Sequence, residues 1–347
     1  MTTASWSPVG RGIDDILAER PRRQSLPGFD PIYSDIVDYI LRCTHRIWEE
    51  KNVGLIESHY GADCALHTLA GPVRGAPAVI ANTLATLAAF PDRTLIGEDV
   101  IWSEDRPGTF YTSHRIASVM THLGDDPTFG PATGRRALIH TIADCVCVEN
   151  RIVEEWLVRD NGWLCVQLGL DLRALAARQA SEDRARDPSV HAWREAEIAR
   201  VRAGGAASAE TSLALAWRSA IEARMLGDAA RRYAEAAELA WPTGRRGFGR
   251  AGFIGLMTQL LAPLTDVAFS VDHVSETPLP DGDTASAMRW TLTGSHRRGG
   301  AKAAANDRAL LILGITHARL RNGFIIEERT IFDDLAIARQ MLGGLGA

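Results

Sequence analysis

Apolar residues recur at helical spacing near the start of each half of the chain. The first run begins at Asp30, and its isoleucines fall near multiples of about 3.6 residues, at Ile32, Ile36, Ile40 and Ile47. Similar patterns predict helices over residues 53–60, 76–89, 212–226, 228–239 and 251–261. Between the halves, an Arg-, Ala- and Glu-rich stretch over residues 172–203 predicts a helical linker.

Runs rich in Val, Ile and Thr follow the helices of each half and are typical of β-strands. In the first half, turns such as Pro107-Gly108 separate the predicted strands, which cover residues 94–102, 110–122, 136–149 and 151–158. In the second half the strands extend to Ile331, and Asn322-Gly323 is a strong hairpin signal. Helices that precede antiparallel strands indicate an α+β fold rather than a parallel α/β sheet.

The two halves repeat each other at a nearly constant offset. Ile152-Val153-Glu154-Glu155 recurs 173 positions later as Ile325-Ile326-Glu327-Glu328, and Tyr60 recurs as Tyr233. A period this long indicates two homologous domains, since solenoid repeats run to roughly 20–50 residues. We therefore expect an N-terminal arm over residues 1–29, a first domain over 30–171, a helical linker over 172–208 and a second domain over 209–347.

Composition narrows the classes of partner and location. The net charge is −5 without a basic stripe, so no nucleic-acid partner is expected. Apolar residues never run for about 18 positions, and the polar start of the chain lacks the apolar core of a secretory signal. We therefore expect no membrane span and a cytoplasmic location, with the five cysteines as buried free thiols. The lack of metal-spaced Cys/His clusters and of a phosphate-binding loop predicts no metal and no cofactor.

Several segments resemble the SnoaL-like polyketide cyclase family. In the first half they are Gly75 before a helix, Phe90-Pro91-Asp92, a strand ending at Thr121-His122, the loop 129–135, the strand 151–156, Asp160 and Gln167-Leu168-Gly169. The second half keeps the segment 289–296, the stretch from Asn322 to Asp333, and Gln340. The resemblance covers residues 35–171 and 210–342, and it is more specific for the fold than for a reaction.

This resemblance implies a nuclear transport factor 2-like fold: two tandem cone-shaped α+β domains, each a curved antiparallel sheet wrapped around N-terminal helices. Relatives with this fold include ketosteroid isomerase, scytalone dehydratase, limonene epoxide hydrolase and non-catalytic binding modules. The resemblance also implies a pocket for a small hydrophobic molecule that uses carboxylates and histidines without a cofactor. Since such domains often pair through their sheets, we expect an intramolecular pseudo-dimer, with a homodimer as the alternative.

Glu155 is the leading candidate for a catalytic base. The resemblance puts the base Asp of the family's aldol cyclases at Leu157, or at Thr330 in the second copy, and neither residue takes up a proton at neutral pH. Glu155 shares the strand face of Leu157, whereas Glu154 points the opposite way. Burial beside Leu157 would raise the pKa of Glu155 and suit it to general-base catalysis. A solvated or ion-paired glutamate is the alternative, and the counterpart Glu328 carries the same ambiguity.

Histidines and aspartates complete the candidate catalytic set. His122 and its counterpart His296 match the family's histidine at the end of the central strand, and His122 is predicted to be the proton partner of Glu155. A structural histidine is the alternative. Asp160 and its counterpart Asp333 also remain, although an Asp between a strand and a helix is often an N-cap. Further residues are predicted to contact the ligand: Tyr60, His67, Trp102, His140, Asp144, Leu157 and His317.

One strand differs in polarity between the copies. By our alignment, the residues Ile312, Thr316 and His317 of the second copy replace His140, Asp144 and Cys145 of the first. The first copy therefore has more polar strand positions, which favours it as the reactive one.

Three functions are compatible with these residues. The first is a cofactor-independent lyase or isomerase of the cyclase kind, such as an ester cyclase, which acts on a small hydrophobic carbonyl compound by carboxylate and histidine acid–base chemistry. The second is a non-catalytic module for small-molecule binding or dimerisation, which the missing base at Leu157 and Thr330 favours. The third is a hydratase or epoxide-opening enzyme with a carboxylate-activated water, which would need a second polar group beside the carboxylate; His140 and Asp144 would provide it if they face the pocket.

Overall fold

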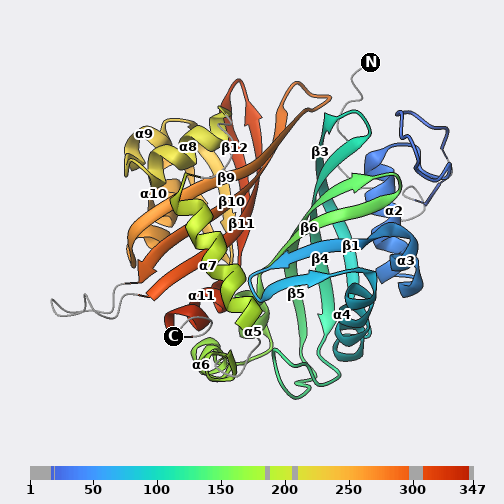
Figure 1. Cartoon of the computed structure of the whole chain (residues 1–347). Helices are drawn as coiled ribbons and strands as arrows, with labels where there is room; N and C mark the ends of the chain where they lie inside the picture. The colour runs from blue at the N-terminus through green and yellow to red at the C-terminus, as the bar shows by residue number, and fades with distance from the viewer. Residues whose placement is uncertain (1–16, 19, 184–187, 205–209, 297–307, 344–347) are drawn as a thin grey trace.

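The chain folds into two similar α+β domains. The computed structural model describes residues 17–18, 20–183, 188–204, 210–296 and 308–343. It contains two six-stranded sheets, each with helices of its own (Figure 1). The helices α2, α3 and α4 lie on one outer side of the molecule and α8, α9 and α10 on the other, so that the two sheets face each other in the centre.

The first domain begins with helices and ends with a four-strand meander. Its elements are α2 (Ile36–Trp48), η1 (Val53–Leu55), α3 (Ile56–His59), β1 (Tyr60–Thr68), β2 (Gly71–Arg74), α4 (Ala76–Ala89), β3 (Thr94–Arg106), β4 (Thr109–Thr121), β5 (Arg136–Val148), β6 (Arg151–Arg159) and α5 (Asn161–Gln167). The sheet order is β2-β1-β6-β5-β4-β3, in which only β1 and β6 are parallel neighbours.

The second domain repeats this arrangement. Its elements are α8 (Ser212–Ile221), α9 (Leu226–Ala230), β7 (Tyr233–Trp241), β8 (Arg245–Phe248), α10 (Gly249–Leu261), β9 (Leu264–Pro278), β10 (Thr284–His296), β11 (Arg308–Arg321), β12 (Phe324–Phe332) and α11 (Asp334–Met341). The sheet order β8-β7-β12-β11-β10-β9 matches that of the first domain strand by strand.

Two helices, α6 (Leu172–Asp183) and α7 (Pro188–Arg202), connect the domains. Helix α7 contacts β9, β10 and β11 of the second domain and also β2 of the first. In Figure 1 it runs diagonally in front of the second-domain sheet and reaches the edge of the first domain. The connection is therefore packed against both domains.

The predicted helix over residues 228–239 is wrong. Helix α9 ends at Ala230, and β7 begins at Tyr233. The Ala- and Glu-rich sequence has helical propensity, but Ala237 and Leu239 are buried in the core as part of a strand that pairs with β12. Sheet pairing and burial therefore outweigh local propensity here. The equivalent strand β1 was also not predicted.

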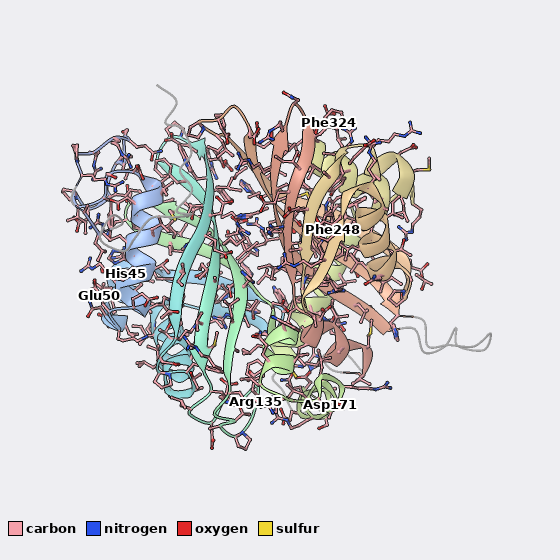
Figure 2. The ribbon with its side chains drawn as sticks, turned by 180° about the vertical axis from the view of Figure 1, so that it is seen from behind. His45, Glu50, Arg135, Asp171, Phe248 and Phe324 are labelled. Carbon is pink, nitrogen blue, oxygen red and sulfur yellow. The ribbon has the colours of Figure 1, made fainter. Side chains whose placement is uncertain are left out.

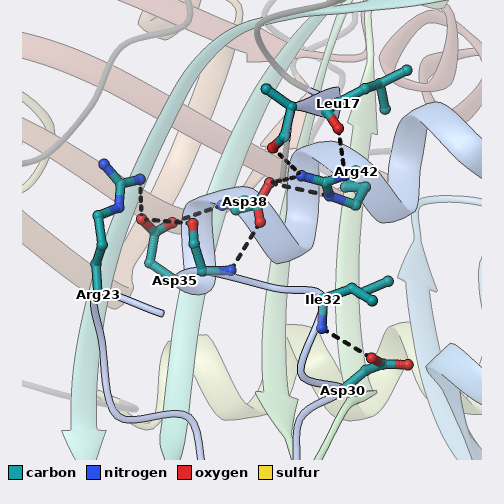
Figure 3. Close-up of polar contacts among 9 residues, drawn as sticks. Leu17, Arg23, Asp30, Ile32, Asp35, Asp38 and Arg42 are labelled. Atoms are coloured by element: carbon teal, nitrogen blue, oxygen red, sulfur yellow. Dashed lines mark hydrogen bonds and ion pairs between the residues drawn. The ribbon is translucent and has the colours of Figure 1, made fainter. Parts of the chain in front are cut away.

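Helix α2 begins later than the isoleucine spacing predicts. Asp35 caps it by accepting a hydrogen bond from the backbone N–H of Asp38, and Ile32 precedes the helix with 45% of its surface exposed. Arg42 donates to the Asp38 carboxylate and to the Leu17 carbonyl, which ties residue 17 to the helix (Figure 3). Further along the predicted arm, Leu26 and Phe29 are buried in the core of the first domain.

The two sheets pack against each other through their outer faces. Side chains from both domains form one buried apolar cluster, namely Ile142, Val158, Leu313, Ile315 and Ile331. Other residues lie on surfaces away from this contact (Figure 2). In the first domain, His45 and Glu50 form an ion pair there. In the second domain, the rings of Phe248 and Phe324 are exposed there. No helix in the described part of the chain is both long and apolar enough to span a membrane.

Candidate functional site

A cavity of about 440 Å³ lies inside the first domain. Helices α2 and α4 close it on one side, and the inner faces of β1, β4, β5 and β6 close it on the other. Much of its lining is apolar, including Ile40, Ile47, Leu66, Val79, Ile116 and Leu157. A concave cavity that combines apolar side chains with a few polar groups is typical of a small-molecule site.

Glu155 points into this cavity from β6. Its face of the strand also carries Leu157 and Arg159, which line the same cavity, whereas Glu154 lies on the other face. Glu155 is only 6% exposed, and the Tyr60 hydroxyl donates to its Oε2 over 3.0 Å. Burial raises the pKa of Glu155 to about 7, although the Tyr60 hydrogen bond and the charge of Arg159 act in the opposite direction. Both protonation states are therefore accessible near neutral pH.

Three polar atoms of the cavity lining are buried without a hydrogen-bond partner among the described residues. They are His114 Nε2, Thr141 Oγ1 and Arg159 Nε. Burial lowers the pKa of His114 to about 3, with the nearby His317 contributing in the same direction, so this imidazole is neutral at pH 7. Unpaired buried polar atoms are costly, which indicates that a ligand or solvent satisfies them.

The equivalent glutamate of the second domain is fully enclosed. Glu328 has no exposed surface and accepts hydrogen bonds from four side chains. Trp241 Nε1 donates over 2.7 Å, Thr330 Oγ1 over 2.9 Å and Trp217 Nε1 over 3.4 Å, and the fourth donor is the Tyr233 hydroxyl. Burial raises the pKa of Glu328 as well, but the donors leave little room for a substrate proton.

Aromatic rings occupy the interior of the second domain. Five residues that line the cavity of the first domain correspond to aromatic residues in the second. Four of these pairs follow from the strand registers, and the pair on the helix follows from the 173-residue offset. The pairs are Thr44 with Trp217 on the helix, and Thr68 with Trp241, Leu95 with Phe269, Ile116 with Trp290, and Arg159 with Phe332 on the strands. Gly314 takes the place of Thr141, and a Cβ there would lie 2.1 Å from the Trp290 ring. The second interior is thus filled where the first is open.

The strand registers also correct one alignment made from the sequence. Cys145 pairs with Glu155, and Ala318 pairs with Glu328, so the offset in this strand is 173 rather than 172. His317 therefore corresponds to Asp144. A shift of one residue exchanges the two faces of a strand, and both residues in fact face the other domain rather than the interior.

His122 does not lie with Glu155. It follows the end of β4, stacks on Phe90 with ring centroids 5.0 Å apart, and accepts from the Thr133 backbone N–H at Nδ1. It is absent from the cavity lining, where His114 is the histidine. His296 ends β10, and its buried Nδ1 has no partner among the described residues.

Asp160 and Asp333 are helix caps, as the alternative interpretation holds. Asp160 accepts from the Trp163 backbone N–H over 3.0 Å and from that of Thr243 in the second domain over 2.8 Å. Asp333 accepts from the backbone of α11 and from Asn161. Burial raises the pKa of Asp160 to about 7, and each of its carboxyl oxygens accepts a backbone hydrogen bond.

Two of the predicted ligand contacts, Asp144 and His317, instead lie where the domains meet. Asp144 pairs with Arg289 over 2.6 Å, and the Arg289 guanidinium lies 3.4 Å from the centre of the Trp156 ring. His317 Nε2 is 2.8 Å from Ser113 Oγ. Asp144 and His317 therefore form contacts between the domains and do not line the cavity.

Other predicted contacts are also outside the cavity. His67 stacks on Trp156 and lies 2.9 Å from Glu154, while His140 is 3.4 Å from Glu98. Trp102 packs beside the core of the first domain and its carbonyl accepts from Thr277. Tyr60 and Leu157 do line the cavity with Glu155.

One family model matches the sequence of the second domain. The model of the SnoaL-like polyketide cyclase family matches residues 211–341. No curated protein matched the chain.

Solved structures similar to this chain each correspond in length to one domain. AclR, a proposed hydroxylase from Streptomyces galilaeus, is 24% identical, with a TM-score of 0.33, over 38% of this chain and 92% of its own. IdmH, a proposed polyketide cyclase from Streptomyces antibioticus, is 22% identical, with a TM-score of 0.33, over 39% of this chain and 98% of its own. A proposed SnoaL-like polyketide cyclase from a Jannaschia species is 14% identical, with a TM-score of 0.34, over 43% and 99% respectively.

Proposed function

We propose that the first domain is a cofactor-independent lyase or isomerase. The second domain matches the model of the SnoaL-like polyketide cyclase family, and the first domain repeats its strand order. Its substrate would be a small hydrophobic carbonyl compound bound in the 440 Å³ cavity. The observation that carries the proposal is a buried carboxyl, Glu155, whose pKa of about 7 lies in the range useful for a general base.

In the proposed reaction Glu155 removes a proton from the carbon next to the substrate carbonyl. The electron pair moves to the carbonyl oxygen, and the unpaired Thr141 hydroxyl or a neutral His114 donates a hydrogen bond to the enolate that forms. The enolate carbon then attacks a second carbonyl of the same molecule or is reprotonated at another position. Protonated Glu155 returns its proton in that step, so no external oxidant or cofactor is consumed.

Tyr60 would act as a positioning residue in this scheme. Its hydroxyl donates to one oxygen of Glu155, which leaves the other oxygen for the substrate. This hydrogen bond also favours the ionised form of the carboxyl and so keeps its pKa from rising further.

The second domain fits a different role, that of a non-catalytic partner. Its interior is filled by Trp217, Trp241 and Trp290, and its glutamate is bonded by four side chains. We infer that it supports the first domain as the other half of an intramolecular pseudo-dimer. The hydratase alternative lacks its required groups, since His140 and Asp144 lie on the outer face of β5.

The test compares two neighbouring glutamates of β6. Cyclic ketones, enones and lactones are screened for turnover by the full chain, and the rate is then measured for Glu155→Gln and Glu154→Gln. We expect Glu155→Gln to lower kcat by about 100-fold or more, since general-base catalysis contributes about 10²–10⁴-fold. Glu154→Gln, on the other face of the same strand, should retain the wild-type rate. Equal rates for the two variants would remove Glu155 from the reaction.

A further inference from the structure

Two arginines line the same cavity away from Glu155. Arg93 follows α4 and is 4% exposed, and Arg159 is the last residue of β6. Because Arg159 is four residues beyond Glu155 on the same strand face, their Cα atoms are about 13 Å apart. The cavity therefore has a carboxyl region and an arginine region. A second cavity of about 280 Å³, which reaches the second domain, is also lined by both arginines.

Neither arginine has a carboxylate within 4.0 Å in the part of the chain that the structure describes. Arg93 Nε donates to Ser118 Oγ over 3.3 Å, and its guanidinium lies 4.9 Å from the Trp48 ring. Arg159 Nε is buried without an acceptor. By contrast, the buried Arg289 is paired with Asp144. Buried guanidinium groups are ordinarily compensated by an anion, so the buried Arg93 and the half-buried Arg159 stand out.

The pKa values of the two arginines are consistent with an anion-binding role. Burial, and then the charge of Arg159, lower the pKa of Arg93 to about 9. Burial also lowers the pKa of Arg159, and Glu155 offsets this only in part. Both shifts mean that the protein's own groups compensate the charged guanidinium groups poorly, and a bound anion would raise both pKa values.

Two other carboxylates raise the pKa of Arg159 only through longer-range charge effects, and both accept other hydrogen bonds. Asp126, which lines the cavity, accepts from the backbone N–H groups of Thr128 and Phe129 over 2.7 and 3.0 Å. Asp333 caps α11 and accepts from Asn161. The chain therefore does not itself supply an ion-pair partner to Arg159 within the described residues.

We propose that the cavity binds an elongated hydrophobic acid whose carboxylate lies between Arg93 and Arg159. The free Nε edge of Arg159 offers the two parallel N–H donors that match a carboxylate. The ring or chain of the acid occupies the apolar middle of the cavity, beside Ile116 and Leu157. The placement of a carbonyl of the same ligand beside Glu155 rests on the proposed function, whereas the binding of the carboxylate does not.

The test uses the full chain and a pair of probes that differ in charge. Binding of naphthoate and of its neutral amide, naphthamide, is measured by calorimetry at pH 7 in wild type, Arg159→Gln, Arg159→Lys and Arg136→Gln. We expect naphthoate to bind wild type about tenfold or more tightly than naphthamide, as a charge-assisted bidentate contact predicts. Arg159→Gln should abolish this preference, Arg159→Lys should keep part of it, and Arg136→Gln, at an exposed position of β5, should leave it unchanged.

Each other outcome overturns the inference. Equal affinities for the two probes in wild type, or a preference that survives Arg159→Gln, would show that no carboxylate site exists at these arginines. Binding of neither probe would overturn the inference together with the ligand-binding role of the cavity. The last outcome separates the two proposals. If Glu155→Gln abolishes turnover but wild type shows no preference for acidic substrates, the proposed function stands and only the carboxylate contact with the arginines is overturned.

Discussion

Glu155 is a carboxyl that gains or loses its proton near neutral pH. The cause is burial among apolar side chains, with one hydrogen bond from Tyr60 that favours ionisation. Its counterpart Glu328 is equally buried but has four donors and no open space. At the scale of single residues, the copies therefore differ in what surrounds the glutamate rather than in the glutamate itself.

Glu155→Gln should stabilise the fold at alkaline pH. The folded pKa of about 7 lies above the value of about 4.3 for an exposed glutamate, so this carboxyl contributes stability below pH 4 that is lost as the pH rises through 7. The loss in folding free energy is on the order of 3 kcal/mol, and glutamine does not undergo it because its side chain does not ionise. In urea unfolding from pH 5 to pH 8, the free energy of unfolding of the variant should increase relative to that of wild type as the pH increases. A difference that is constant with pH would contradict the assigned pKa.

Tyr60→Phe should raise the pKa of Glu155 further, because it removes the hydrogen bond that favours the carboxylate. The acidic limb of the kcat/KM profile should then shift to higher pH, while the plateau at alkaline pH changes less. The matched control is Tyr233→Phe in the second domain, which should leave the profile where it is. A profile that is unchanged in Tyr60→Phe would mean that Tyr60 does not act on the base.

Part of this site could be predicted from sequence and part could not. Alternation along β6 places Glu155 on the face of Leu157, and Tyr60 was named as a contact, and both line the cavity. The same alternation, continued by two residues, would have found Arg159. His114 and Arg93 come from other elements, and their place in the same cavity as Glu155 depends on sheet register and helix packing that no local pattern encodes. His122 was proposed from the family resemblance, and the structure places it past the end of β4 and outside the cavity lining.

At the scale of elements, the two sheets carry the same backbone with different interior side chains. Trp290 packs over Gly314 in the second domain, where the first has Ile116 over Thr141. Sequence reasoning found the repeat and most strands of the meander. It missed β1 and β7, because these strands are stabilised by pairing with the distant β6 and β12 rather than by their own alternation.

Filling the first cavity should abolish binding without unfolding the domain. The change is Ile116→Trp together with Thr141→Gly, which copies the pair found in the second domain. The indole would occupy the space of the ligand, and the glycine would remove the clash. We expect the naphthoate-induced rise in melting temperature to disappear while the variant itself melts close to wild type. Retention of ligand binding in this variant would show that the ligand uses another site.

At the scale of the whole molecule, the outer faces of the sheets join the domains through apolar and ionic contacts. The buried pair of Arg289 and Asp144 lies within this contact, with the guanidinium over Trp156. Asp160 adds a hydrogen bond to the Thr243 backbone of the second domain. These contacts explain why interface residues such as Asp144 and His317 resemble site residues in sequence, since both kinds are polar and sit on strands.

Asp144→Ala should destabilise the joined domains by about 3–5 kcal/mol, because it leaves the Arg289 charge buried without its partner. Replacing both residues with leucine should cost much less. Denaturant unfolding followed by tryptophan fluorescence and by circular dichroism would measure both variants. Equal losses for the single and double changes would mean that the ion pair is not buried in solution.

The central claim is that catalysis belongs to the first domain and that the second domain, although it keeps the glutamate, does not react. The most direct measurement is kcat with one substrate for Glu155→Gln and for Glu328→Gln, with folding of each checked by circular dichroism. The account predicts a loss of about 100-fold or more for Glu155→Gln and a wild-type rate for Glu328→Gln. A loss confined to Glu328→Gln, or equal losses in both variants, would contradict it.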